Sequence, residues 1–272
     1  MDIELDTTEE GTCTNVFIIL GKRRSGKTTL LSALVRSIAA NGRVVVVDPV
    51  GSAGALLKRP YHRVFAASGN KQTERFFKDL YRQAEEGREY LLVIDEADEY
   101  TNLNGQFSSE SLYRLLNYGR NFGVGIVACS RRAANLPKDF LSNSDFLCLF
   151  SHHEPNDLDY LGGMLSDSRG RDYVVALRNL PEHIFLLWET SSPDPFRGFF
   201  QVQDGAIVAW RPGPSEGTAE ASGYASDAPG SSTGDSEAPT APNATETPTG
   251  NPSGSSNSGT GPADGGNGQN SS

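Results

Sequence analysis

Cysteine is scarce in this 272-residue chain, and its three copies are widely spaced. Cys13, Cys129 and Cys148 form no C-x-x-C pair, and the last two lie inside apolar runs, where a thiol behaves as a small buried hydrophobe. We therefore expect neither a disulfide framework nor a zinc site, and this cysteine usage fits a reducing cytoplasm.

Long apolar runs are also missing. No run approaches the roughly 18 residues that a membrane-spanning helix needs. The first residues, MDIELDTTEEGTCTN, are acidic and lack the apolar core of a signal peptide. We expect a soluble, cytoplasmic protein without a membrane span.

The C-terminal part lacks the side chains that build a core. Residues 213–272 contain no Leu, Ile, Val, Phe, Lys or Arg, and Tyr224 is their only aromatic residue. Such a segment cannot bury enough apolar surface to offset the entropy of ordering its backbone. We therefore predict a flexible N-terminus over residues 1–12, one folded domain over 13–211, and a disordered acidic tail over 212–272.

The net charge of −10 is unevenly distributed. The predicted tail holds seven acidic residues and no basic one, which leaves 27 acids and 24 bases, a net charge of −3, for the rest. A near-neutral domain neither requires nor forbids a polyanionic partner, because a local basic patch is enough to bind one.

Short β-branched runs alternate with helical patterns across the predicted domain. This alternation indicates βαβ units and a parallel sheet. We predict strands over 16–20, 44–47, 63–66, 90–94, 124–129, 146–150 and 184–188, a small hairpin over 199–210, and helices over 28–40, 73–86, 109–121 and 156–165.

A phosphate-binding pattern, G-x-x-x-x-G-K-[ST], lies between the first strand and the first helix. The backbone N–H groups of such a loop and the positive end of the helix dipole form a concavity for phosphate oxygens. Lys27 is expected to reach the β- and γ-phosphates, and the Thr28 hydroxyl is placed to ligate Mg²⁺. The predicted nucleotide-binding residues are Gly21, Lys22, Arg23, Arg24, Ser25, Gly26, Lys27, Thr28 and Thr29.

Two acidic residues, Asp95 and Glu96, follow an apolar strand. Asp95 stands where P-loop ATPases keep the carboxylate that holds the metal, and Glu96 is the candidate to polarise the attacking water. A glutamate beside the metal-holding aspartate favours a hydrolase over a nucleotide kinase or a switch GTPase. The Asn/Thr-Lys-x-Asp pattern of guanine recognition is absent, so we predict ATP and Mg²⁺ as cofactors.

The order of these motifs resembles the FtsK–HerA superfamily, ring-forming DNA translocases that include the genome-packaging ATPases of tailless icosahedral viruses. The resemblance covers about residues 15–190 and implies an α/β fold: a RecA-like (ASCE-type) P-loop NTPase with a mainly parallel sheet flanked by helices. Besides the loop and the acidic pair, the residues that carry it are Asp48-Pro49-x-Gly51 and Arg120-x-x-Gly123-Val124-Gly125-Ile126-Val127-Ala128-Cys129-Ser130-Arg131-Arg132.

By this resemblance, Arg120 would be an arginine finger that acts on the nucleotide of the neighbouring subunit. Arg114 is a second candidate, and an ordinary exposed arginine at a helix end is the alternative for Arg120. The family usually places Thr or Ser and then Gln after the next strand, as a sensor of the γ-phosphate. Here Ser130 can take the polar role, whereas Arg131 replaces the glutamine.

The resemblance implies an ATP-hydrolysing translocase of double-stranded DNA, acting as a homo-oligomeric ring with a viral capsid or portal-vertex protein as a candidate partner. Lys58-Arg59 and Arg169-Gly170-Arg171 are candidate DNA contacts, with solvated surface as the plainer reading. An ATPase for phage export, protein export or conjugative transfer stays open, as does a nucleotide-dependent scaffold. His152-His153-Glu154 is interpreted as a surface turn because further metal ligands at suitable spacing are missing.

Overall fold

The computed structural model describes residues 5–39, 42–49, 63–65, 70–101, 106–163, 165, 173–190 and 197–211. These residues all lie in the first of the two units into which the chain divides, Met1–Pro229. The predicted tail over 212–272 lies outside the described residues, as do the candidate DNA contacts Lys58, Arg59, Arg169 and Arg171.

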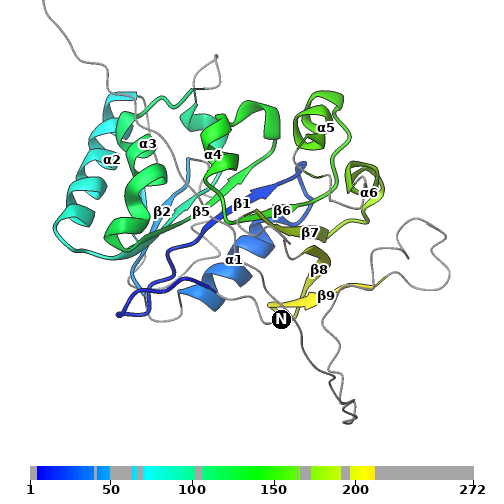
Figure 1. Ribbon diagram of the computed structural model, residues 1–272, viewed down its shortest axis with the longest axis horizontal. Coiled ribbons are helices and arrows are strands. Elements are labelled where there is room, and N and C mark those ends of the chain that lie inside the picture. Colours follow the sequence, from blue (N-terminus) through cyan, green and yellow to red (C-terminus); the bar gives the residue numbers. More distant parts are fainter. Residues whose placement is uncertain are drawn as a thin grey trace, which may run out of the picture. The chain divides into compact units, whose positions relative to one another are not determined.

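The described residues build a sheet of nine strands in the order β3-β2-β4-β5-β1-β6-β7-β8-β9 (Figure 1). Neighbouring strands pair in parallel from β3 to β6 and antiparallel from β6 to β9. The strands are β1 (Val16–Leu20), β2 (Val44–Val47), β3 (Arg63–Phe65), β4 (Tyr90–Ile94), β5 (Val124–Ser130), β6 (Phe146–Leu149), β7 (Ile184–Glu189), β8 (Arg197–Gln203) and β9 (Ala206–Ala209).

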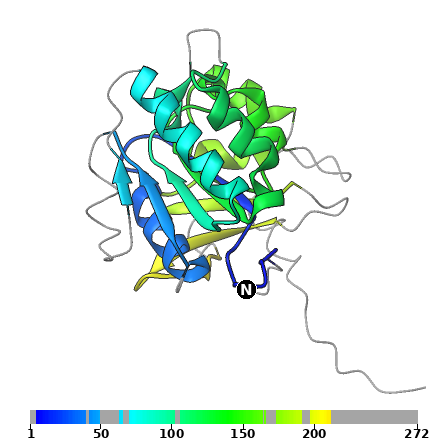
Figure 2. The same ribbon diagram turned by 90° about the vertical axis from the view of Figure 1, so that its left-hand side faces the viewer.

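Helices cover both faces of this sheet, with α1 on one face and α2 and α3 on the other (Figures 1 and 2). Alternate strand residues serve the two layers: Ile18 of β1 packs into the core under α2 and α3, and Ile19 into the core under α1. The helices are α1 (Lys27–Ile38), α2 (Asn70–Glu85), α3 (Glu110–Tyr118), α4 (Lys138–Ser142), α5 (Pro155–Gly162) and α6 (Tyr173–Asn179), with 3₁₀ turns η1 (Ala97–Tyr100), η2 (Gly119–Phe122) and η3 (Ala133–Asn135).

The four valines of β2 show why the central strands read as unbroken apolar runs. Each residue of Val44–Val47 is 0% exposed, because one face of the strand packs on α1 and the other on the opposite layer. A parallel sheet covered on both sides needs this composition. The predicted α/β fold with a mainly parallel sheet flanked by helices is confirmed.

Several boundaries differ from the sequence-based prediction. The helix expected over 109–121 ends at Tyr118 and continues as the 3₁₀ turn η2, which Gly123 closes at a φ of 73°. The hairpin expected over 199–210 extends the main sheet, because β8 pairs with β7. The short helices α4 and α6 were not predicted, since five and seven residues are too few to show a helical period.

The sequence predicts that Cys129 and Cys148 are buried, and the structure confirms it. All three are buried and free of disulfides. Burial raises the pKa of the Cys148 thiol to about 12, so this residue stays a neutral thiol. Across the described ranges, no helix is both long and apolar enough to cross a bilayer.

Candidate nucleotide site

The predicted phosphate loop runs from the end of β1 to the start of α1 and approaches its neighbours too closely for side chains at its glycines. A Cβ on Gly21 would lie 2.6 Å from the Cβ of Phe150, which follows β6. Gly26 has a φ of 107°, and a Cβ there would lie 2.9 Å from Nδ1 of His183. Both positions therefore require glycine, and Phe150 and His183 wall the loop.

Gly26 is also the N-cap of α1, and it provides no side-chain cap. The first turn of α1 contains no acidic residue. Backbone N–H groups at a helix N-terminus that lack such partners favour an anion, both as hydrogen-bond donors and through the helix dipole.

Lys27 and Ser25 place polar atoms inside the loop. The Lys27 ammonium donates to the carbonyl oxygens of Gly21, at 2.8 Å, and Lys22, at 3.1 Å. Burial lowers the pKa of Lys27, while the charges of nearby acids, Glu96 among them, oppose that shift. The buried hydroxyl of Ser25 has no hydrogen-bond partner among the described residues. A glycine cradle with an inward ammonium and an unpartnered hydroxyl fits the phosphates of a nucleotide.

The other predicted loop residues differ in exposure. Lys22, Arg23 and Arg24 are exposed, and Arg24 has a left-handed backbone with a φ of 66°. Thr28, the predicted Mg²⁺ ligand, is half-buried in the first turn of α1, and Thr29 is exposed.

The acidic pair lies at the same edge of the sheet as the loop. β4 pairs with β5 and β5 with β1, all in parallel, so Asp95 and the phosphate loop both follow the carboxyl ends of strands. Asp95 is buried, and its Oδ1 accepts the backbone N–H of Glu96 at 3.1 Å. Glu96 is half-buried and has a left-handed backbone, with φ 52° and ψ 56°. Asp48, after β2, is also buried at this edge.

Ser130 and Arg131, at the end of β5, both contact the segment that carries the acidic pair. The fully buried Ser130 hydroxyl donates to Oδ1 of Asp98 at 3.0 Å. Arg131 Nε donates to Oε2 of Glu96 at 3.0 Å, and its Nη2 lies 3.9 Å from Oε1 of Glu99. Burial raises the pKa of Glu96, and the charges of Arg131 and Lys27 act against that rise.

Arg120 lies at the other edge of the sheet. It pairs with Asp145, whose Oδ2 also accepts the backbone N–H of Val16 at 2.7 Å, at the start of β1. The phosphate loop follows the opposite end of β1, and the five residues of this strand separate the loop from Val16 by about 16 Å.

The other finger candidate, Arg114, pairs with Glu110 on the exposed face of α3. The structure therefore brings Lys27, Asp95, Glu96 and Ser130 together and sets Arg120 apart.

The interpretation of His152-His153-Glu154 as a surface turn is wrong for His152. This side chain is 3% exposed, and Nδ1 lies 2.6 Å from the carbonyl oxygen of Phe150. Burial lowers the pKa of His152. The chain stays buried for two residues beyond Phe150, where the apolar run ends. This run was the available sequence signal for the burial of His152. The described residues hold no cluster of three or more His, Cys, Asp or Glu suited to a metal.

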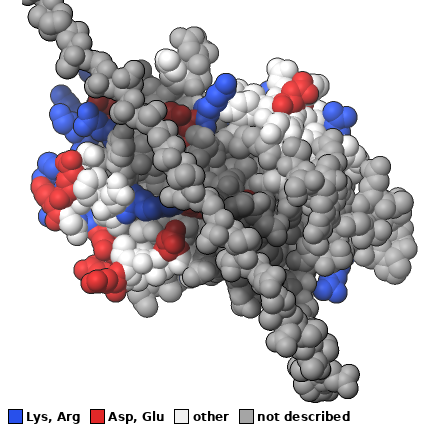
Figure 3. Space-filling view, in the orientation of Figure 1, with Lys and Arg blue, Asp and Glu red and all other residues white. Residues whose placement is uncertain are grey.

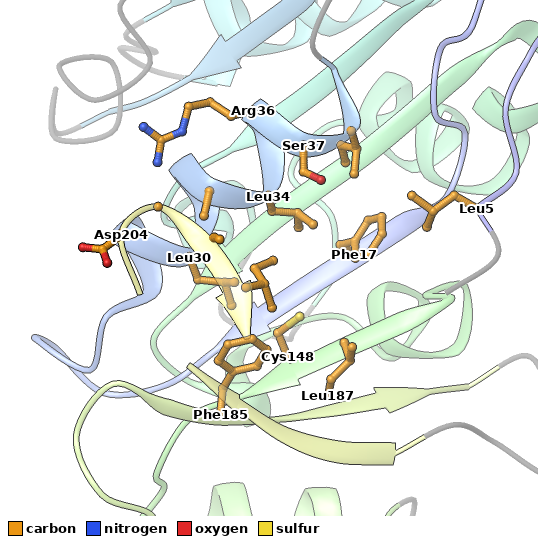
Figure 4. Close-up of a pocket in the computed structure, with 15 residues that line it drawn as sticks. Leu5, Phe17, Leu30, Leu34, Arg36, Ser37, Cys148, Phe185, Leu187 and Asp204 are labelled. Atoms are coloured by element: carbon orange, nitrogen blue, oxygen red, sulfur yellow. The ribbon is translucent and has the colours of Figure 1, made fainter. Parts of the chain in front are cut away.

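A cavity of about 640 Å³ lies on the α1 face of the sheet, away from this site (Figure 4). Leu30 and Leu34 of α1, Phe17 of β1 and Phe185 of β7 contribute apolar lining, and none of its described lining residues belongs to the phosphate loop. Arg36 and Asp204 reach its rim (Figure 4). An apolar chamber of this kind does not suit a phosphate.

Residues 13–133 match the AAA domain family. A curated relative, the probable DNA double-strand break repair helicase HerA of Methanocaldococcus jannaschii, is 34% identical over 92 residues. That stretch is 33% of this chain and 18% of HerA, so this chain spans a small part of the relative.

Two solved structures share the fold. The genome packaging NTPase B204 of Sulfolobus turreted icosahedral virus 2, in complex with AMP, superposes with a TM-score of 0.56 at 16% identity over 67% of this chain and 96% of B204. The pCW3 conjugation coupling protein TcpA, with ATPγS, has a TM-score of 0.52 at 15% identity over 68% of this chain and 59% of TcpA.

The fold and the loop are those of P-loop ATPases with a RecA-like sheet. The resemblance to the FtsK–HerA superfamily that the motif order predicts is confirmed, with HerA matched in sequence and B204 in fold.

Proposed function

We propose that this protein hydrolyses ATP to move double-stranded DNA through a homo-oligomeric ring, and that it packages a viral genome. The observation that carries the proposal is the separation of Glu96 and Arg120 at opposite edges of one sheet. A chain with an arginine so far from its own phosphate loop can offer that arginine to a neighbour's nucleotide. Such a finger couples hydrolysis to assembly of the ring.

At each site, Lys27 and the backbone N–H groups of the loop would bind the phosphates, and Thr28 and Asp95 would hold Mg²⁺. Bound Mg²⁺–ATP supplies the phosphoryl group and the metal charge that offsets charge developing during transfer. Glu96 would orient the attacking water and accept its proton.

The choice of DNA rests on similarity to proteins whose names describe genome packaging and DNA repair. Figure 3 shows acidic and basic side chains intermingled over α2 and α3. There Arg82 pairs with Asp79 and Glu86, and Arg114 with Glu110. Cations already neutralised in this way are poor phosphate contacts, so Arg82 and Arg114 are weak candidates for the DNA path. We expect the ring to work in the cytoplasm, or on the virion, with a capsid or portal-vertex protein as its partner.

The decisive experiment measures ATP hydrolysis by the full chain with and without double-stranded DNA. We expect DNA to raise kcat at least about tenfold, and the Glu96→Gln variant to serve as the inactive control. A rate indifferent to DNA, yet raised by a capsid or secretion partner, would exclude a DNA translocase.

Conjugative transfer or export is the second candidate, favoured by the fold likeness to the coupling protein TcpA. Translocation assays with single- and double-stranded substrates separate the two functions. Movement of single-stranded DNA alone would favour conjugation. Binding of ATP without measurable turnover under any of these conditions would favour a nucleotide-dependent scaffold.

A further inference from the structure

The ion pair between Arg131 and Glu96 joins the ends of β5 and β4 beside the phosphate loop. We propose that Arg131 is a positioning residue that holds the Glu96 carboxylate for its work on the attacking water. The inference rests on the ATP hydrolysis proposed above, and it assigns a role to the arginine that replaces the glutamine usual in this family.

The backbone of Glu96 explains why its side chain needs a partner. Along a strand, side-chain directions alternate and are set by the sheet. Glu96 has left the strand, and its φ of 52° places it in the left-handed region that residues with a Cβ seldom adopt. The direction of its carboxylate therefore depends on what binds it, and Arg131 Nε binds Oε2 at 3.0 Å.

The surrounding charges make this partner more important. Asp95 precedes Glu96 in the chain, and Asp98 and Glu99 follow within three residues. These carboxylates repel that of Glu96, whereas the guanidinium of Arg131 lies against Glu96 and 3.9 Å from Glu99. The Lys27 ammonium lies against the loop carbonyl oxygens, so it does not replace Arg131.

Arg131 is itself held on both sides. The hydroxyl of Ser130 donates to Asp98 and accepts the backbone N–H of Arg132 at 3.2 Å. The guanidinium of Arg132 lies 2.9 Å from Oδ2 of the buried Asp157. Because the residues on both sides of Arg131 are fixed by these contacts, the backbone at Arg131 is fixed too. This limits the positions that its guanidinium can reach, as a positioning role requires. Its bond engages Oε2 and leaves Oε1 outside this ion pair, available to accept a hydrogen bond from water.

The test compares hydrolysis with binding of a non-hydrolysable ATP analogue, measured by fluorescence titration. We expect Arg131→Ala to lower kcat about tenfold to a hundredfold and to change the analogue's Kd and the KM for ATP less than about threefold. Arg131→Lys keeps a cation and should recover part of kcat. Arg82→Ala, which removes an equally ion-paired exposed arginine on α2, is the matched control and should match the unmodified chain.

A double-mutant cycle adds a criterion that a general loss of structure would not meet. If Arg131 acts through Glu96, Arg131→Ala should have almost no further effect on kcat in the Glu96→Gln background. A kcat of Arg131→Ala equal to that of the unmodified chain would overturn the proposal. Equal losses of kcat and of analogue binding would also overturn it, because they would make Arg131 a phosphate contact. Loss of basal kcat in Arg131→Ala, together with turnover indifferent to DNA, would support the positioning role and reject DNA translocation.

Discussion

The two ends of β5 each carry an arginine paired with a carboxylate, and the two pairs differ in what else holds the acid. Asp145, the partner of Arg120, is buried, and its Oδ2 also accepts the N–H of Val16. Glu96, the partner of Arg131, is more exposed and stands on a left-handed backbone. The arginines themselves are almost equally exposed, at 46% and 45%, so the difference lies in the acids.

This difference sets what each arginine can do. If Arg120 turned toward a neighbouring subunit, Asp145 would keep a backbone donor and its place between β1 and β6. If Arg131 turned away, Glu96 would lose the group that directs its carboxylate. The comparison therefore suits Arg120 to action on another subunit and Arg131 to action within its own.

Removing Arg120 should have the largest catalytic effect. Loss of an arginine finger lowers kcat by about 10³-fold or more, so Arg120→Ala should be nearly inactive while still binding ATP. Mixing it with Lys27→Ala subunits should restore part of the activity, because each variant supplies what the other lacks. Steady-state hydrolysis across a series of mixing ratios measures this. Full activity of Arg120→Ala alone, with no gain on mixing, would leave Arg120 a structural partner of Asp145.

Glu96→Gln should follow, with a loss of kcat of about 10² to 10³-fold, since the amide cannot accept a proton from water. ATP binding should persist, because Lys27 and the loop remain. Single-turnover hydrolysis and nucleotide titration distinguish the two steps. Normal turnover in this variant would remove Glu96 from the mechanism.

Unlike the two substitutions above, which lower kcat, Asp145→Asn should act mainly on the free energy of unfolding. A buried acid that binds both a guanidinium and a backbone N–H contributes on the order of 2 kcal/mol to the free energy of unfolding. Glu96→Gln should change that free energy by less than about 1 kcal/mol, as expected for a half-exposed ion pair. Urea denaturation of both variants gives the comparison, and equal destabilisation would contradict the distinction drawn between the pairs.

Gly26→Ala should lower the free energy of unfolding by about 1 kcal/mol or more, because Gly26 has a φ of 107° and an added Cβ would meet His183. Nucleotide binding should weaken as the loop shifts. Gly163→Ala is the control, since that glycine has a φ of −68° and no neighbouring atom within 4 Å. Equal Tm values for the two variants would mean that the loop tolerates a Cβ.

Much of the candidate nucleotide site could be predicted because the sequence patterns that indicate it span only a few residues. The loop from Gly21 to Thr28 needs only a strand before it and a helix after it, and Asp95 and Glu96 directly follow a strand of five buried residues. The Arg131–Glu96 pair could not be predicted, because its members lie 35 residues apart and meet only through the pairing of β4 with β5. The surface turn predicted at His152 was wrong because it rested on the lack of further metal ligands at suitable spacing, which says nothing about burial.

The sequence by itself determined the P-loop class, the central parallel strands and the chemical groups at the nucleotide edge, because glycines, apolar periodicity and strand-end carboxylates act over a few residues. The tertiary structure alone decided which arginine faces which acid. Arg120 and Arg131 are 11 positions apart and similar in kind, yet the seven residues of β5 send them to opposite edges of one sheet. The order of the strands in the sheet, which no local pattern encodes, decides which acid each arginine meets.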